Sequence, residues 1–259
     1  MDFGKFAKAF APVIAIAIAA TVSGCDGANI SINGEEGKRL SELDLSDAAP
    51  TDLVVLGPDE VRVTTGEKLA ITLEGDAAAQ DLVRFTLKDG TLAVLRANRK
   101  IGSADNPAIV KVTMPAPGEV TMAGSGKIFL AALGKSATVN VAGSGLVEAT
   151  AIASDSLDVT IAGSGAFRGA GSTSKLKLDV LGSGSAALDA LKADKADVTI
   201  AGSGNTAFSS DGEVDANIMG SGEVKVKGRA RCTVSSMGSG RLVCEAGVTQ
   251  KDKSAKKEG

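Results

Sequence analysis

The chain of 259 residues is long enough for one large or two ordinary domains, and its hydrophobic fraction of 44% is sufficient for a buried core. Its formal charge of −3 provides no basic surface, so we expect no nucleic acid as a partner. The sequence contains no His. This composition excludes Ser-His-Asp and Cys-His catalysis and the common zinc sites, and we expect no cofactor.

The N-terminal segment has the proportions of a secretory signal. Two lysines precede an apolar run at residues 9–22, which is too short to cross a bilayer comfortably. The run ends in Val22-Ser23-Gly24-Cys25, which resembles the lipobox of bacterial lipoproteins. This resemblance implies a signal peptide at 1–24 and a lipidated N-terminal Cys25, which anchors the protein to a membrane of the cell envelope, on the periplasmic side of the inner membrane or at the outer membrane. An ordinary cleaved signal is the alternative.

A polar linker is predicted at residues 25–46, and residues 47–117 then alternate apolar and polar side chains as β-strands do. The predicted strands are 53–56, 61–64, 69–73, 83–87, 92–95 and 109–114. Asp89-Gly90 predicts a hairpin turn, because both residues tolerate positive φ. A helical turn is expected within 75–80.

Residues 118–246 contain an internal repeat that is marked by the triplet Gly-Ser-Gly. Successive triplets start 18 to 20 residues apart, which indicates a structural period and not a flexible linker. The triplets are Gly124-Ser125-Gly126, Gly143-Ser144-Gly145, Gly163-Ser164-Gly165, Gly182-Ser183-Gly184, Gly202-Ser203-Gly204, Gly220-Ser221-Gly222 and Gly238-Ser239-Gly240. We interpret all of them as structural turns, because glycine permits a sharp change of chain direction.

Apolar residues recur two and four positions before, and four and six positions after, the first glycine of the triplets. For Gly143 these residues are Val139 and Val141 before the triplet and Val147 and Ala149 after it. Each triplet therefore lies between two short strands whose alternate side chains point inward. A coil of this length cannot bury its inner face alone, so the coils must stack. We predict an all-β fold, a single-stranded β-helix or β-solenoid, with the N-terminal β part continuous with it.

Two further cysteines, Cys232 and Cys244, lie in the last coil in the inward phase. In an oxidising compartment they could form a disulfide that closes the stack, and two buried free thiols are the alternative. The Lys-rich end of the chain, residues 247–259, is predicted to be a disordered tail.

Outward positions three and five residues before the triplets are mostly polar and include four aspartates. These weak candidates for metal ligands are Asp158, Asp179, Asp197 and Asp215. Clustered carboxylates are suitable ligands for calcium. Lys177 interrupts the column, however, and aligned polar residues are also typical of a solvated β face. We therefore assign no metal site and no catalytic residue.

Segments 53–63, 88–92 and 112–115, followed by the repeats from Gly124, together resemble the head GIN domain family. Members of this family, whose function is unknown, are often described as auto-transporter adhesins. The resemblance covers about residues 32–245. It implies a β-helical fold and a cell-envelope setting, and it supplies no catalytic residue. The scarcity of aromatic residues argues against carbohydrate adhesion by stacking on aromatic rings.

These observations favour a non-catalytic lipoprotein of the cell envelope that acts as an adhesin or as an interaction scaffold for an unknown envelope or surface partner. A calcium-dependent polysaccharide-active β-helix enzyme and a purely structural spacer are the alternatives. Oligomers are compatible with the sequence, because the ends of a β stack invite pairing unless they are capped.

Overall fold

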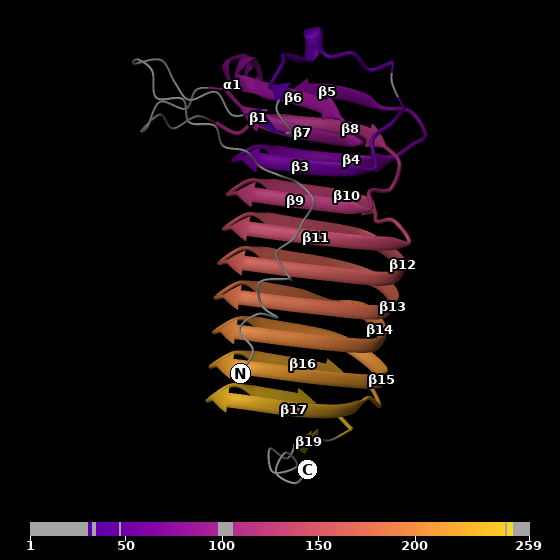
Figure 1. Ribbon diagram of the computed structural model, residues 1–259, viewed down its shortest axis with the longest axis vertical. Helices are drawn as coiled ribbons and strands as arrows, with labels where there is room; N and C mark the ends of the chain where they lie inside the picture. Colours follow the sequence, from indigo (N-terminus) through magenta and orange to yellow (C-terminus); the bar gives the residue numbers. More distant parts are fainter. Residues whose placement is uncertain (1–30, 33–34, 47, 98–105, 247, 251–259) are drawn as a thin grey trace, which may run out of the picture.

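Successive coils of the chain stack on one another along one axis in the computed structural model (Figure 1). The structure describes residues 31–32, 35–46, 48–97, 106–246 and 248–250. The predicted signal peptide and Cys25 lie outside these residues. Within the part of the chain that the structure describes, no helix combines the length and the apolar character that a membrane crossing requires.

The Gly-Ser-Gly repeat forms parallel strands that pair coil on coil. In chain order the strands are β9 (Glu119–Gly124), β10 (Lys127–Ala132), β11 (Ser136–Gly143), β12 (Leu146–Gly163), β13 (Ala166–Gly182), β14 (Ser185–Gly202), β15 (Asn205–Gly220), β16 (Glu223–Lys227), β17 (Arg231–Gly238) and β18 (Arg241–Cys244). The register places first glycine on first glycine, so that Gly143 pairs with both Gly124 and Gly163. The prediction of a β-solenoid with coils turned at these triplets is confirmed.

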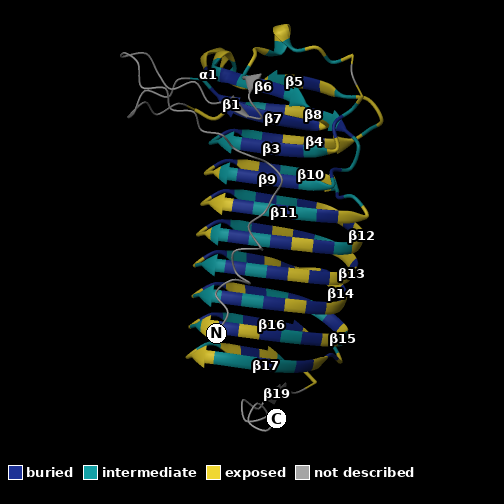
Figure 2. Ribbon diagram, in the orientation of Figure 1, coloured by how far each residue is buried: buried dark blue, intermediate teal, exposed yellow. Residues whose placement is uncertain are grey.

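Two faces meet at the Gly-Ser-Gly corners. We call the residues one to five positions before the first glycine face A, those three to seven positions after it face B, and the rest of each coil the connecting stretch. Buried and exposed residues alternate along the strands (Figure 2). The predicted inward side chains are buried on face A at Val120, Met122, Val139, Val141, Val159, Ile161, Leu178, Val180, Val198, Ile200, Ala216 and Ile218, and on face B at Ile128, Leu130, Val147, Ala149, Phe167, Ala186, Leu188, Phe208, Val224 and Val226. These residues form one continuous core.

The corner requires its two glycines for different reasons. Gly163, the first residue of its triplet, has a φ of 113°, a region that favours glycine. A Cβ atom on Gly165, the third residue, would lie 2.6 Å from Val141 Cγ1 and 2.8 Å from the carbonyl oxygen of Gly145 in the preceding coil. The central Ser164 is exposed, and its N–H donates to the carbonyl oxygen of Gly143 at 2.9 Å. The corners are therefore scaffold elements that bond coil to coil through the backbone.

The N-terminal part contributes further coils and a cap. Its strands are β3 (Asp52–Gly57), β4 (Glu60–Thr65), β5 (Ala70–Glu74), β6 (Val83–Lys88), β7 (Thr91–Arg96) and β8 (Ile109–Met114), and α1 (Ala77–Leu82) precedes β6. The predicted strands and the helical turn are confirmed in type, with small differences in their ends. Asp89 and Gly90 have φ of 51° and 76° in the turn between the antiparallel strands β6 and β7, which confirms the predicted hairpin.

The order of the coils along the stack differs from their order in the chain. β3 and β4 pair in parallel with β9 and β10 on one side and with β7 and β8 on the other. β5 and β6 run antiparallel to β8 and β7 and close this end of the stack. The segment after β3 is therefore a corner of the same kind as the triplets: Gly57 pairs with Gly124 and has a φ of 131°.

A buried ion pair occupies this first corner. Asp59 stands where the triplets have their third glycine, and both Asp59 and Arg96 are buried. Arg96 donates from Nε to Asp59 Oδ2 at 2.9 Å and from Nη2 to Asp59 Oδ1 at 2.7 Å. The N–H of Ala108 donates to Asp59 Oδ1 at 2.8 Å. These bonds join the corner of β3 and β4 to both ends of the connection between β7 and β8.

At two predicted domain boundaries the structure describes additional elements. The predicted linker at 25–46 contains β1 (Ser31–Ile32), β2 (Glu35–Glu36) and a 3-10 helix (Leu40–Glu42). Leu40, Leu43 and Leu45 pack against the core, so their apolar spacing was a structural signal. The predicted tail at 247–259 contains β19 (Val248–Gln250), which pairs in parallel with β17. The disorder predicted for 251–259 concerns residues outside the described part.

Candidate functional site

Face A carries columns of outward side chains that the register aligns along the stack. The column five positions before the glycines contains Asp52, Glu119, Thr138, Asp158, Lys177, Asp197, Asp215 and Thr233. The column three positions before them contains Thr121, Asn140, Thr160, Asp179, Thr199, Asn217 and Ser235. Adjacent members of a column are about 4.8 Å apart, which is the spacing of neighbouring strands. We call the six carboxylates of the two columns, with the polar side chains between them, the acidic face.

Most carboxylates of the acidic face form no ion pair with another described residue, although Lys177 lies between Asp158 and Asp197 in the same column. Within the described residues, Asp52, Glu119, Asp158 and Asp197 form no ion pair, whereas Asp179 lies 3.2 Å from the Nζ of Lys177. Face B and the connecting stretch differ, because their carboxylates are largely paired. Their ion pairs include Glu148 with Arg168, Asp189 with Lys227, Asp211 with Lys192 and Arg229, Glu213 with Lys195 and Arg231, and Glu223 with Lys225 and Arg241.

The electrostatic difference also appears in the pKa values. Asp52 and Glu119 lie on adjacent strands, and the N–H of Glu119 donates to Asp52 Oδ1 at 3.2 Å. Burial raises the pKa of both carboxyl groups, and the charge of Asp52 raises that of Glu119 further. By contrast, a hydrogen bond from Lys192 lowers the pKa of Asp211, and hydrogen bonds from Lys195 and Arg231 lower that of Glu213. Burial, and not a basic partner, therefore dominates the pKa of Asp52 and of Glu119.

The structure does not bring the four candidate metal ligands together. Asp197 and Asp215 pair across adjacent strands, but Lys177 separates Asp158 from Asp197, and Asp179 belongs to the other column. Among the described residues there is no group of three or more His, Cys, Asp or Glu that could hold a metal ion.

A shallow hollow of about 230 Å³ lies on face B. It forms where the large side chains of this face give way to Ala187 and Ala207. The ion pair between Lys227 and Asp189, at 3.3 Å, lies beside the hollow, and the hydroxyl of Thr206 donates to the carbonyl oxygen of Ala186. The lining offers no nucleophile paired with a base, so it gives no indication of catalysis.

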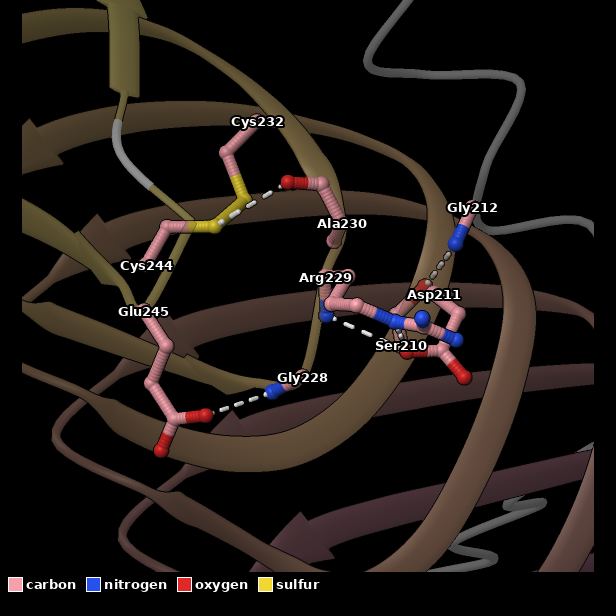
Figure 3. The surroundings of a disulfide bond; sticks show 9 residues. All are labelled: Ser210, Asp211, Gly212, Gly228, Arg229, Ala230, Cys232, Cys244 and Glu245. Carbon is pink, nitrogen blue, oxygen red and sulfur yellow. Dashed lines mark hydrogen bonds and ion pairs between the residues drawn. A yellow bond between two sulfur atoms is a disulfide. The ribbon is translucent and has the colours of Figure 1, made fainter.

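The end of the last coil contains the two remaining cysteines. A disulfide joins Cys232 to Cys244, whose Cα atoms are 6.5 Å apart (Figure 3). Of the two alternatives that the sequence left open, the structure therefore has the disulfide. The bond connects β17 to β18 across the inside of the coil. Close to it, Glu245 accepts a hydrogen bond from the N–H of Gly228 at 2.8 Å.

Stacked coils of this kind define a β-solenoid with long polar faces. The sequence profile of a family described as "Putative auto-transporter adhesin, head GIN domain" matches residues 49–230, and the chain belongs to this family. No curated protein matches the sequence.

Solved structures with the same fold come from Bacteroides and Parabacteroides species. A putative adhesin from Bacteroides fragilis is 16% identical, with a TM-score of 0.57, over 78% of this chain and 92% of that chain. A putative lipid binding protein from Parabacteroides distasonis is 21% identical, with a TM-score of 0.54, over 79% of this chain and 94% of that chain. A putative adhesin from the same organism is 17% identical, with a TM-score of 0.51, over 80% and 94% of the two chains. At these identities the likeness shows the fold alone.

Proposed function

We propose that the protein is a non-catalytic lipoprotein of the bacterial cell envelope, an adhesin or interaction scaffold that contacts a cationic partner through its acidic face. The family to which the chain belongs is described as adhesin-like, which supports a place at the cell surface or in the envelope. The lipobox resemblance at Cys25 supports a lipid anchor. A chain without His and without a cofactor motif has few routes to catalysis.

The proposal that face A is the contact surface rests on its carboxylates that form no ion pair in the described part of the chain. Carboxylates elsewhere on the rod are largely paired with Lys or Arg of nearby coils. Within the described residues, no such ion pair is formed by Asp52, Glu119, Asp158 or Asp197. Charge that a protein leaves unpaired attracts a partner of opposite charge and aligns it. Because the columns repeat with every coil, a basic polypeptide segment could contact several carboxylates at once.

Capture from crosslinked envelopes tests the contact surface. The protein with Asp158→Asn and Asp197→Asn should recover a basic partner at least about tenfold less well than the wild type, because both substitutions remove exposed, unpaired charges. The matched control is Asp155→Asn with Asp194→Asn, which removes two exposed carboxylates from the connecting stretch and should capture the partner normally. Equal capture by both double variants would contradict the acidic face as the contact surface.

The anchor has its own test. We expect Cys25→Ser to move the protein from the membrane fraction to the soluble fraction and to abolish incorporation of labelled palmitate. Protease treatment of intact cells would then distinguish an exposed adhesin from a periplasmic component. Unchanged fractionation and labelling after Cys25→Ser would show that the lipobox resemblance is misleading.

A further inference from the structure

The two ends of the rod are closed in different ways. At the N-terminal end, the antiparallel strands β5 and β6 cover β8 and β7. At the C-terminal end, β19 covers only residues 232–234 of β17. Within the described residues, β18 pairs in register with β16 alone. The outer edge of β18 thus presents backbone N–H and C=O groups that can pair with another strand.

The same end carries the exposed apolar side chains. Among the described residues, the exposed large hydrophobic residues are Met219, Met237 and Val243, with 37%, 48% and 46% of their surfaces accessible. Met219 and Met237 are adjacent on face A, and Val243 is in the middle part of β18. An open strand edge beside exposed apolar side chains is typical of a surface that is covered by a partner.

The sequence of this edge is complementary to itself in one antiparallel register. Arg241, Val243 and Glu245 point outward and are exposed, while Leu242 and Cys244 point inward. Directly opposite residues of an antiparallel pair lie on the same side of the sheet. Pairing centred on Val243 places Val243 opposite Val243 of a second copy. It also places Arg241 of each copy opposite Glu245 of the other, so this contact occurs twice.

Neighbouring registers do not have this complementarity. A shift of one residue would oppose inward and outward side chains. Centring the pairing on Leu242 would place Arg241 opposite Val243 and would leave Glu245 without Arg241. Arg241 already lies 3.3 Å from Glu223 of the preceding coil, so the guanidinium would join two carboxylates in the pair.

We propose that the C-terminal end of the rod binds a second copy of this chain through antiparallel pairing of β18 about Val243. The contact has two-fold symmetry, so it closes as a dimer and does not propagate into a fibre. If Cys25 anchors the chain, as proposed above, the anchor precedes β1, which lies at the opposite end of the rod (Figure 1). Two anchored copies would then meet tip to tip, each from its own membrane surface. Only this consequence depends on the proposed anchor.

Light scattering and analytical ultracentrifugation of the purified full chain with Cys25→Ser test the pairing without the lipid. We expect a concentration-dependent dimer. Arg241→Glu and Glu245→Arg should each weaken it at least about tenfold, because each places like charges opposite one another twice. An equimolar mixture of the two variants should form heterodimers, since both contacts then join opposite charges. The double variant Arg241→Glu with Glu245→Arg should dimerise like the parent.

A matched control is Arg231→Glu, which reverses an exposed arginine of the same coil away from the β18 edge and should leave the dimer intact. Circular dichroism verifies that every variant is folded. The proposal is overturned by a parent chain that stays monomeric at all concentrations, by a dimer that neither charge reversal weakens, or by a mixture that forms no heterodimer. Failure here leaves the acidic face and the anchor untouched, because those tests use other residues.

Discussion

The corner between β3 and β4 and the corners of the Gly-Ser-Gly repeat have buried side chains at the same offsets, but different residues occupy the third position of the corner. In the repeat, the third residue is glycine because the preceding coil's carbonyl oxygen and inward side chain occupy the space for a Cβ atom, as at Gly165. The corner at Gly57-Pro58-Asp59 lies beside the coil of β7 and β8, whose two strands are joined by a longer connection. There the side chain of Asp59 takes the place of a Gly-turned corner and binds Arg96. Glycine is thus required in a third position that stacks on a preceding corner, as at Gly126 and Gly165, whereas the side chain of Asp59 is accepted on the side that faces Arg96.

Substitution of a first glycine gives the largest expected effect. At Gly202, φ is 134° and a Cβ atom would clash with the carbonyl oxygen of Gly182, whereas at Gly57, φ is 131° and a Cβ atom would meet no atom within 4 Å. Gly202→Ala should therefore lower the free energy of unfolding by roughly 5 kcal/mol, from strain and overpacking together. Gly57→Ala should cost about 1 to 3 kcal/mol from strain alone. Urea unfolding measures both, and equal losses would contradict the role of close stacking in the repeat.

Removal of the buried carboxylate comes next. Asp59→Ala removes the buried carboxylate that accepts hydrogen bonds from Arg96 and from the N–H of Ala108, and we expect a loss of at least about 3 kcal/mol in the free energy of unfolding. The control is Glu60→Ala, which breaks an ion pair with the half-exposed Arg62 in the same coil and should cost below about 1 kcal/mol. Similar losses from the two variants would show that the ion pair does not hold this corner.

The disulfide has a smaller, local effect. It joins residues 12 apart in sequence, and the chain entropy of a loop of this size is worth about 2 to 3 kcal/mol. Cys232→Ser with Cys244→Ser should lower the free energy of unfolding by that amount. The intact mass of the exported protein should rise by two hydrogens on reduction. An unchanged mass would show that the thiols are free in the exported protein.

The smallest expected effect is the pH dependence of the acidic face. Because the folded pKa of Glu119 is raised, its contribution to stability is present below the pKa of the unfolded chain and is lost as pH rises through the folded pKa. Glu119→Gln should raise the free energy of unfolding at neutral pH by less than about 1 kcal/mol, because the group is partly exposed, and the gain should vanish in acid. Asp211, whose pKa is lowered, should behave oppositely: Asp211→Asn destabilises at neutral pH and is silent in acid. Parallel pH profiles for the two variants would refute this assignment.

Much of the fold could be predicted because the determinants of the repeat are local. The period of the triplets and the apolar residues at fixed offsets suffice to give the coils, their stacking and their inward residues. The first corner escaped prediction because its neighbour along the stack is not its neighbour in the chain. Its signal was nevertheless present: Leu53, Val55, Val61 and Val63 stand at the same offsets from Gly57 as the inward pairs of the repeat, and all four are buried.

The candidate site could likewise be predicted only in part. The outward phase of Asp158 and Asp197 follows from the repeat, but the neighbouring carboxylates of Asp52 and Glu119 depend on β3 stacking beside β9. The partner of Asp59 was equally inaccessible, because Arg96 is 37 residues away and no pattern connects the two. Which carboxylates lack an ion pair depends on side-chain positions that a single sequence does not give.

Site-specific photo-crosslinking in the native envelope can show directly whether the acidic face is the contact surface. A photoreactive side chain would replace Thr160, which lies in the column next to Asp179 on face A, or Ser174, which is exposed in the connecting stretch. We expect an adduct with a basic partner from position 160 and none from position 174. Adducts from position 174 alone, or from neither position, would contradict this expectation.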